Sequence, residues 1–201
     1  MASIAVLDYG SGNLESVSRA IAKVGGSPVI TDDLDKIVNA DALVIPGVGH
    51  FGSCMRAIAH HGLDQVVRSH VAGGRPLFGV CVGMQVLLES SEEDPEPGLA
   101  ILPGGSRMLP RGVTVPHMGW NTVEWSGTHP YIAGIGSGTR YYFVHSFAPD
   151  VSDWTVGVTD YGREFSSVLA RDNVFATQFH PEKSGEAGLQ MYENFVKEVT
   201  R

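Results

Sequence analysis

Gly79-Val80-Cys81-Val82-Gly83-Met84-Gln85 is the stretch of sequence that decides the fold of this chain. Pro76-Leu77-Phe78 before it predicts a buried strand, and the apolar residues that continue to Leu88 predict a helix. A cysteine between a strand and a helix, with glycine two residues before and two residues after it, is typical of a nucleophile elbow. The glycines are expected because neighbouring backbone comes too close in this turn to leave room for a side chain. The sequence therefore predicts that Cys81 presents its thiol to a substrate.

The position of Cys81 also predicts how the thiol is activated. At the N-terminus of a helix, the positive end of the helix dipole favours a thiolate. The N–H of Val82 faces the same point and can stabilise a developing oxyanion. The alternative is a buried structural cysteine beside a turn, and the G-x-C-x-G pattern alone does not decide between the two.

Length and composition limit the class of protein. With 201 residues, 43% hydrophobic and 18% charged, we expect one globular domain over residues 1–201. The net charge of −8 argues against nucleic acid as a partner, and no apolar run is long enough to cross a membrane. The N-terminal apolar residues read as a strand and not as a signal peptide. Only two cysteines occur, Cys54 and Cys81, which favours a reducing, cytoplasmic location without disulfides. The eight histidines show no ligand spacing, so we expect no metal and no cofactor.

The first half of the chain alternates strands and helices, which predicts a mostly parallel sheet covered by helices on both faces. Ligands in such sheets bind at the carboxyl ends of the strands, so loops 8–13 and 46–50 and Cys81 are expected at one edge. The predicted strands are 3–7, 29–30, 42–45 and 76–78, and the predicted helices are 14–24, 34–38, 51–59 and 63–72.

The second half is richer in β structure, which predicts added antiparallel strands. Residues 89–98 read as an acidic surface loop with no role beyond solubility. Asp172-Asn173 is a predicted hairpin turn, and residues 187–199 a final helix. The candidate strands are 107–109, 122–125, 140–147, 154–158, 164–170 and 174–180.

His180-Pro181-Glu182 follows the predicted strand 174–180. Residues two apart in extended chain point to the same side, and proline keeps the residue before it extended. His180 and Glu182 are therefore expected to be hydrogen-bonded, with the carboxylate fixing the tautomer of an imidazole that faces the thiol. A lone histidine at a strand end would more simply be satisfied by local backbone, but this histidine shares the chain with an elbow cysteine.

Over its whole length the chain resembles the class I (triad) glutamine amidotransferases, which pair a G-x-C-x-G elbow with a downstream H-P-E. The resemblance implies that fold, a catalytic triad of Cys81, His180 and Glu182, and glutamine as substrate. It implies substrate contacts from Gly47, Gln85, His145 and Ser146, and an oxyanion hole from Val48, Gly49 and Val82.

Smaller motifs are similar to one family within that class, the glutaminase subunits of imidazole glycerol phosphate synthases. They are Asp8–Leu14, Pro46–Phe51, Pro116–Asn121, Tyr142–Phe147 and Phe179–Ser184. This resemblance implies a heterodimer with a (β/α)₈-barrel cyclase subunit, which receives the ammonia in histidine biosynthesis. Asn13, Trp120 and Lys183 are the candidates for that interface, against the alternatives of a core aromatic for Trp120 and a solvated lysine for Lys183.

Three other interpretations remain open at this point. One is the glutaminase subunit of another synthase that docks on a barrel, such as pyridoxal 5′-phosphate synthase. Another is a stand-alone cysteine hydrolase on the same elbow, against which Gln85 and the block 116–121 speak. The last is a non-catalytic partner of a synthase, which keeps the fold without the chemistry. The presence of Cys81, His180 and Glu182 argues against it.

Overall fold

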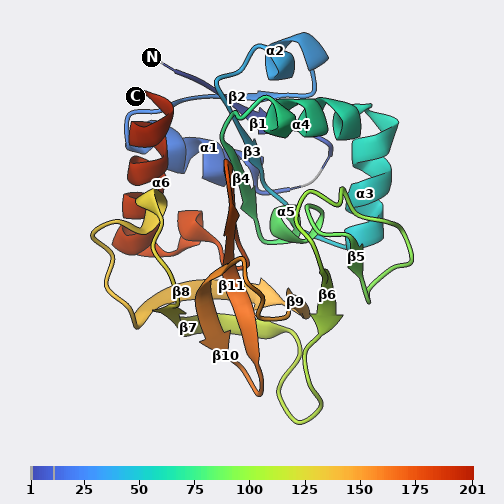
Figure 1. The fold of residues 1–201 in the computed structure, drawn as a ribbon, viewed down its shortest axis with the longest axis vertical. Coiled ribbons are helices and arrows are strands. Elements are labelled where there is room, and N and C mark those ends of the chain that lie inside the picture. Colours follow the sequence, from blue (N-terminus) through green and yellow to red (C-terminus); the bar gives the residue numbers. More distant parts are fainter. Residues whose placement is uncertain (1, 11) are drawn as a thin grey trace.

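The computed structural model describes residues 2–10 and 12–201, and it is built on a nine-stranded mixed sheet. Met1 and Ser11, the latter in the predicted loop 8–13, lie outside the described residues. The strands lie in the order β2-β1-β3-β4-β12-β11-β10-β7-β8 (Figure 1). They are β1 (Ser3–Leu7), β2 (Ser27–Thr31), β3 (Ala42–Ile45), β4 (Leu77–Val80), β7 (His117–Trp125), β8 (Thr139–His145), β10 (Thr155–Asp160), β11 (Glu164–Arg171) and β12 (Val174–Thr177).

The sheet has a parallel half and an antiparallel half, as predicted. Strands β2, β1, β3, β4 and β12 pair in parallel, and every pair from β12 to β8 is antiparallel. Strand β12 joins the halves, because it pairs with β4 on one side and with β11 on the other. The predicted α/β fold class is confirmed.

The helices of the first half lie where the sequence predicts them. Asp33 caps α2 by accepting hydrogen bonds from the N–H groups of Asp35 and Lys36, as expected for that side chain. In Figure 1, α1 and α6 lie on one side of the parallel strands, and α3 and α5 lie on the other. The helices are α1 (Leu14–Lys23), α2 (Leu34–Val38), α3 (Phe51–His60), α4 (Leu63–Ala72), α5 (Val82–Gln85) and α6 (Gly185–Val199), with 3₁₀ turns at Pro130–Ile132 and Pro181–Lys183.

Packed aromatic rings fix the centre of the sheet beneath the elbow. Phe78 on β4 contacts Phe175 on β12 and Phe195 on α6, with ring centroids 5.1 Å and 5.5 Å apart. Burying one such ring contributes about 1.5–3 kcal/mol. This cluster holds β4, which carries Cys81, beside β12, which leads to His180.

Several β-strand boundaries differ from the predictions because long-range pairing sets them. The strand predicted at 122–125 begins at His117, which pairs with His145 across β7 and β8. The strand predicted at 140–147 is two strands, because the chain leaves β8 after His145 and pairs with β6 as β9 (Phe147–Pro149). The strand predicted at 174–180 ends at Thr177, where the chain turns and the N–H of His180 donates to the carbonyl of Tyr142.

The acidic segment 89–98 lies at the surface, as predicted, but the prediction that it has no role beyond solubility is wrong. It forms β5 (Ser90–Ser91), which lies beside β6 (Gly105–Met108) in a second, three-stranded sheet with β9. Its carboxylates accept backbone hydrogen bonds: Glu89 from the N–H of Gly104 and Glu92 from the N–H of Met108. The sequence pattern missed this because the acceptors satisfy backbone groups far along the chain.

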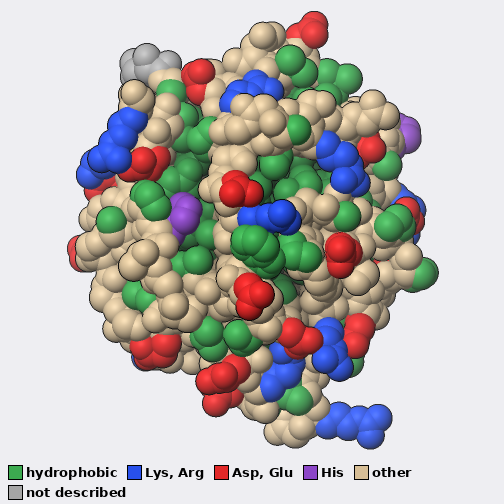
Figure 2. All heavy atoms as spheres, viewed as in Figure 1, with side chains coloured by type: hydrophobic (Ala, Val, Ile, Leu, Met, Phe, Trp, Pro, Cys, Tyr) green, Lys and Arg blue, Asp and Glu red, His purple; other side chains and the backbone are tan. Residues whose placement is uncertain are grey.

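Acidic and basic side chains are interspersed on the face that Figure 2 shows. Among residues 2–10 and 12–201, no helix has the length and apolar character that crossing a bilayer requires.

Candidate active site

Cys81 occupies a strained turn between β4 and α5, as the elbow pattern predicts. Its backbone has φ 55° and ψ −111°, which is unfavourable for a residue with a side chain. The flanking glycines are required by space. A Cβ at Gly83 would lie 1.8 Å from the carbonyl oxygen of Ile45, and one at Gly79 would lie 2.7 Å from the carbonyl oxygen of Gly83.

The helix after the elbow is shorter than predicted. It is the single turn α5, because the carbonyls of the next three residues accept hydrogen bonds from the segment 99–102 instead of continuing the helix. Leu88, for example, accepts from the N–H of Ala100. The macrodipole arises from aligned peptides, so one turn contributes less to a thiolate at Cys81 than the predicted helix would.

His180 and Glu182 form the predicted pair in a different local geometry. The imidazole Nδ1 donates to Glu182 Oε1 over 2.7 Å, and both side chains are fully buried. His180 itself is extended, as a residue before proline should be, but Pro181–Lys183 is a 3₁₀ turn. The turn, and not the predicted alternation of a strand, brings the carboxylate back to the imidazole.

Two further side chains support the Glu182 carboxylate. Asn13 Nδ2 donates to Oε1 over 2.5 Å, and the Tyr192 hydroxyl lies 3.5 Å from Oε2. Burial, together with the nearby carboxylate, raises the pKa of Tyr192 well above its usual value. Asn13, which the sequence assigned to a partner interface, is thus half-buried against the His180–Glu182 pair.

His180 is surrounded by groups that favour its protonated form. Its Nε2 is buried, faces the Cys81 thiol and has no hydrogen bond of ordinary geometry within the described part of the chain. Burial alone would lower the pKa of His180. The interactions with Cys81 and then with Glu182 outweigh it and raise the pKa to about 10. At neutral pH the imidazole is therefore held as an imidazolium, ready to give up a proton.

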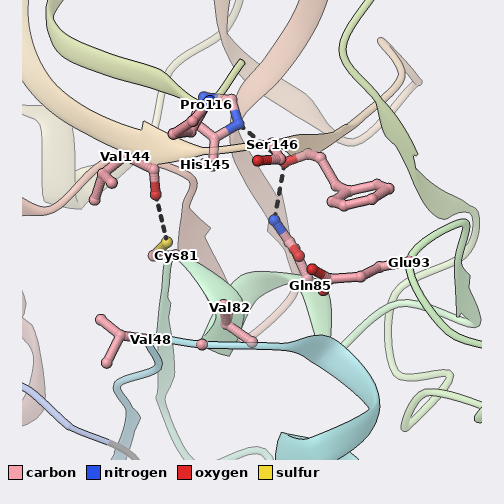
Figure 3. A pocket seen from close by; sticks show the side chains of 11 residues that line it. Val48, Cys81, Val82, Gln85, Glu93, Pro116, Val144, His145 and Ser146 are labelled. Carbon is pink, nitrogen blue, oxygen red and sulfur yellow. Dashed lines mark hydrogen bonds between the residues drawn. The ribbon is translucent and has the colours of Figure 1, made fainter.

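A pocket of about 320 Å³ opens beside Cys81 and brings most of the predicted site residues together (Figure 3). Gly49 in its wall has φ +111°, a conformation that glycine adopts readily. Gly47 lies under the lining, where a Cβ would come within 2.7 Å of the Gly83 nitrogen. The pocket is lined by Val48, Gly49, Cys81, Val82, Gln85, Glu93, Pro116, Val144, His145, Ser146 and Phe147.

Gln85 is held in a fixed orientation on the pocket wall. Its Nε2 donates to the Phe147 carbonyl over 2.9 Å and to Gln178 Oε1 over 3.0 Å. Both amide hydrogens are used, so the carbonyl oxygen of Gln85 remains for a ligand. Gln178 in turn lies with its Nε2 3.7 Å from Cys81 Sγ. Sequence reasoning missed Gln178, although its position two residues before His180 places it on the same stretch.

Glu93 is a pocket residue that the sequence analysis missed. Its carboxylate accepts a hydrogen bond from the N–H of Phe51, the first residue of α3, over 2.7 Å. Figure 3 shows the carboxylate turned toward Gln85 in the pocket. The neighbouring Asp94 lies 3.6 Å from Arg56 on α3 and fixes the segment there. The acidic run 89–98 was the available signal, but its fold over α3 was not predictable from composition.

Trp120 and Lys183 flank one aromatic ring outside the pocket. Trp120 is 48% exposed and packs edge-on against Tyr142, with centroids 6.2 Å apart. Lys183 Nζ lies 6.0 Å from the centre of the same ring. The exposure of Trp120 contradicts the alternative that it is a core aromatic. Its neighbour Met118 is 63% exposed, so this face of β7 is apolar and open.

No group of three His, Cys, Asp or Glu side chains within the described residues is arranged to hold a metal ion.

Comparison with known proteins relates this geometry to one family. The sequence model of the Glutamine amidotransferase class-I family matches residues 5–199. The imidazole glycerol phosphate synthase subunit HisH of Symbiobacterium thermophilum is 46% identical over 202 residues, which cover 99% of this chain and 95% of that protein. The subunit of the same name from Acinetobacter baylyi is 46% identical over 203 residues, covering 98% of each chain.

Solved structures share the fold at lower identity. One titled as a glutamine amidotransferase superposes with a TM-score of 0.74 at 21% identity, covering 97% of this chain and 98% of that one. A chain of PurLQS from Thermotoga maritima has a TM-score of 0.78 at 19% identity, covering 99% of this chain and all of that one.

Proposed function

The chain belongs to the class I glutamine amidotransferase family, and from this premise we propose that it is the glutaminase subunit of an imidazole glycerol phosphate synthase. The names of its relatives support the narrower assignment. The observation that carries the activity is the buried His180–Glu182 pair beside Cys81 at the wall of one pocket. In this proposal, a single domain of residues 1–201 supplies all these groups. The location is the cytoplasm, because two cysteines without a disulfide are typical of a reducing compartment.

The first half of the reaction forms a thioester. Cys81 sulfur attacks the carbon of the glutamine side-chain amide, and the negative oxygen that results is stabilised by N–H groups of Val82 and of the Val48–Gly49 turn. The His180 imidazolium then donates its proton to the amide nitrogen. The carbon–nitrogen bond breaks, ammonia leaves, and a γ-glutamyl thioester remains on Cys81.

The second half hydrolyses the thioester. His180, now neutral, takes a proton from water as the water oxygen attacks the thioester carbon. The carbon–sulfur bond breaks, glutamate is released, and the charged Cys81–His180 pair is restored. Glu182 holds the ring of His180 and stabilises its charged form in both halves.

The α-carbon end of glutamine is held by the far wall of the pocket. The carboxylate of Glu93 suits the α-ammonium group, and it is the one acidic side chain among the residues that line the pocket. The Gln85 carbonyl oxygen is positioned to accept from an N–H of the ligand, since its amide nitrogen has two acceptors already. The backbone of His145–Ser146 completes this wall.

The ammonia is delivered to a (β/α)₈-barrel cyclase subunit, which uses it to make imidazole glycerol phosphate and AICAR in histidine biosynthesis. Ammonia released into water is protonated and lost as a nucleophile, so delivery requires a docked partner. The open apolar face around Trp120 and Lys183 suits that docking, because exposed aromatic residues are frequent interface anchors.

The test is glutamine hydrolysis by the purified chain alone, with the barrel subunit, and with the barrel subunit plus its acceptor substrate. We expect slow hydrolysis alone and faster hydrolysis in the complex. Full activity without a partner would favour a stand-alone hydrolase, and no activity under any condition would favour a non-catalytic subunit. Activation by a pyridoxal 5′-phosphate synthase barrel instead would reassign the partner.

A further inference from the structure

Two buried histidines outside the triad face each other across β7 and β8. His117 and His145 are a cross-strand pair, only 3% and 6% exposed, and His117 Nδ1 lies 3.0 Å from His145 Nε2. The chemistry described above uses neither ring.

The donor and the acceptor of each hydrogen bond around this pair can be assigned. His145 Nδ1 lies 2.9 Å from the Phe147 carbonyl, which can only accept, so Nδ1 carries the hydrogen. Burial lowers the pKa of His145 to about 3 and that of His117 to about 4, so both rings are neutral at neutral pH. His145 Nε2 therefore has no hydrogen and accepts from His117 Nδ1–H. His117 Nε2 accepts in turn from Asn121 Nδ2 at 3.4 Å.

Packing holds the His117 ring in this orientation. The ring lies between Tyr161 and Phe143, with centroids 3.9 Å and 4.9 Å away and interplanar angles of 17° and 20°. A ring stacked on both faces cannot turn out of its plane. The donor at Nδ1 thus points steadily at His145.

The far end of the chain of hydrogen bonds is the wall of the glutamine pocket. The bond from His145 Nδ1 to the Phe147 carbonyl spans Ser146, at the point where the chain passes from β8 to β9. The same carbonyl accepts from Gln85 Nε2, and His145, Ser146 and Phe147 all line the pocket. Without the bond from His117, the buried Nε2 of His145 would have no donor, and this unpaired acceptor would favour movement of the ring and release of the wall.

We propose that His117 is a positioning residue for glutamine binding, which anchors the His145 ring by donating to its Nε2 and thereby holds the Ser146–Phe147 wall in its binding conformation. The inference rests on the proposed glutaminase function, because glutamine is the ligand that this wall would hold. The outer end of the same chain of bonds, at Asn121, opens into a surface pocket of about 540 Å³ that also includes Trp120. The wall is thereby joined to the proposed docking face.

Two substitutions separate the hydrogen bond from the packing. His117→Phe keeps a flat ring between Tyr161 and Phe143 and removes the donor. His117→Asn removes the ring but places an amide N–H where Nδ1 stood. In the complex with the barrel subunit, we expect His117→Phe to raise KM for glutamine about tenfold, with kcat changed less than about threefold. His117→Asn should recover most of the lost affinity.

His129→Phe is a matched control, because His129 also packs against aromatic rings and has a pKa lowered by burial but lies outside this chain of bonds. It should leave KM unchanged. An unchanged KM in His117→Phe, or an equal rise in His117→Phe and His117→Asn, would overturn the inference, since the latter result would mean that only packing matters.

A readout that does not need activity separates this inference from the proposed function. Nitrogen-15 NMR of the full chain should find the resonance of His145 Nε2 shifted by an accepted hydrogen bond in the parent, and His117→Phe should lose that shift. The same Nε2 resonance in both proteins would overturn the inference. If the parent complex fails to hydrolyse glutamine, the proposed function is wrong, and the NMR comparison still decides whether His117 donates to His145.

Discussion

Glu182→Gln is the substitution that best isolates the charge of the triad carboxylate from its geometry. Both strong donors, His180 Nδ1 at 2.7 Å and Asn13 Nδ2 at 2.5 Å, bond to the same oxygen, Oε1. A glutamine can keep its carbonyl oxygen at that place and put its amide group near the Tyr192 hydroxyl, which lies 3.5 Å from Oε2. The contacts of the imidazole are then retained, and only the negative charge is lost.

The expected loss follows from that difference. A hydrogen bond to a charged group contributes about 1.5–3 kcal/mol and a neutral one about 0.5–1.5 kcal/mol, so the substitution costs about 1–1.5 kcal/mol. That corresponds to roughly a tenfold fall in kcat/KM. His180→Ala removes the proton donor itself and should cost roughly a hundred- to ten-thousandfold.

The pH dependence gives an independent measure of the same charge. Activity needs the His180 imidazolium, so in the parent kcat/KM should fall as pH rises through the pKa of about 10. Because Glu182 is one of the two groups that raise this pKa, the fall should move to lower pH in Glu182→Gln. The free energy of unfolding should also fall as pH rises. A raised pKa stabilises the folded protein fully below the unfolded value of about 6.5, and this stabilisation is lost as pH rises toward 10.

Steady-state glutaminase kinetics of the complex from pH 6 to about pH 10.5 would measure both effects, with urea unfolding at the same pH values. Glu186→Gln, an exposed substitution of the same type at the start of α6, is the matched control and should change nothing. A loss in Glu182→Gln as large as in His180→Ala, or an alkaline limb that does not move, would refute the assigned pairing.

Three further substitutions test the pocket and its surroundings. Glu93→Gln should raise KM for glutamine roughly ten- to a hundredfold by removing the charge opposite the α-ammonium group. The nearby Glu96→Gln is the control and should leave KM unchanged. An unchanged KM in Glu93→Gln would show that Glu93 does not bind glutamine. Trp120→Ala should weaken barrel binding about tenfold in titration calorimetry without lowering the melting temperature, and unchanged binding would exclude Trp120 from the interface. Gly49→Pro lacks the N–H and cannot adopt φ +111°, so the complex should form but lose at least about a hundredfold in glutaminase rate; full activity would exclude this turn from the oxyanion hole.

The Gly49 prediction includes a conformational switch. Val48 and Gly49 line both the active-site pocket and a second cavity of about 150 Å³. The peptide therefore has space to rotate, and positive φ is easy at glycine but unusual at valine. We expect the N–H to turn into the pocket when the partner docks. Equal rates for the free subunit and the complex would contradict this.

Local patterns were enough to predict the parallel half of the sheet and the elbow. The spacing of apolar residues located α1, and the glycines around Cys81 located a turn whose close contacts the structure confirms. The pairing of His180 with Glu182 was predicted for a partly wrong reason, since a 3₁₀ turn and not an extended strand brings the two together.

The missed features all depend on contacts between distant parts of the chain. Glu93 is a pocket residue only because its segment folds over the start of α3. Gln178 reaches Gln85 and Cys81 only because β12 lies beside β4. Asn13 was expected at an interface, but its amide reaches Glu182, 169 residues away. His117 lies in the motif Pro116–Asn121, but its role was not predicted because it depends on the register of β7 against β8. No local pattern contains that information.

The central place of β12 has a consequence for how the protein acquires activity during folding. This strand, Val174–Thr177, lies between β4 and β11 although it is the twelfth in sequence, so the two halves of the sheet cannot join until it inserts. Contacts of such large sequence separation form slowly, because a long loop must close first. A nascent chain that has exposed Cys81 therefore carries a thiol without its base. Cys81 and His180 come together only when the sheet closes, so an incomplete chain cannot consume glutamine.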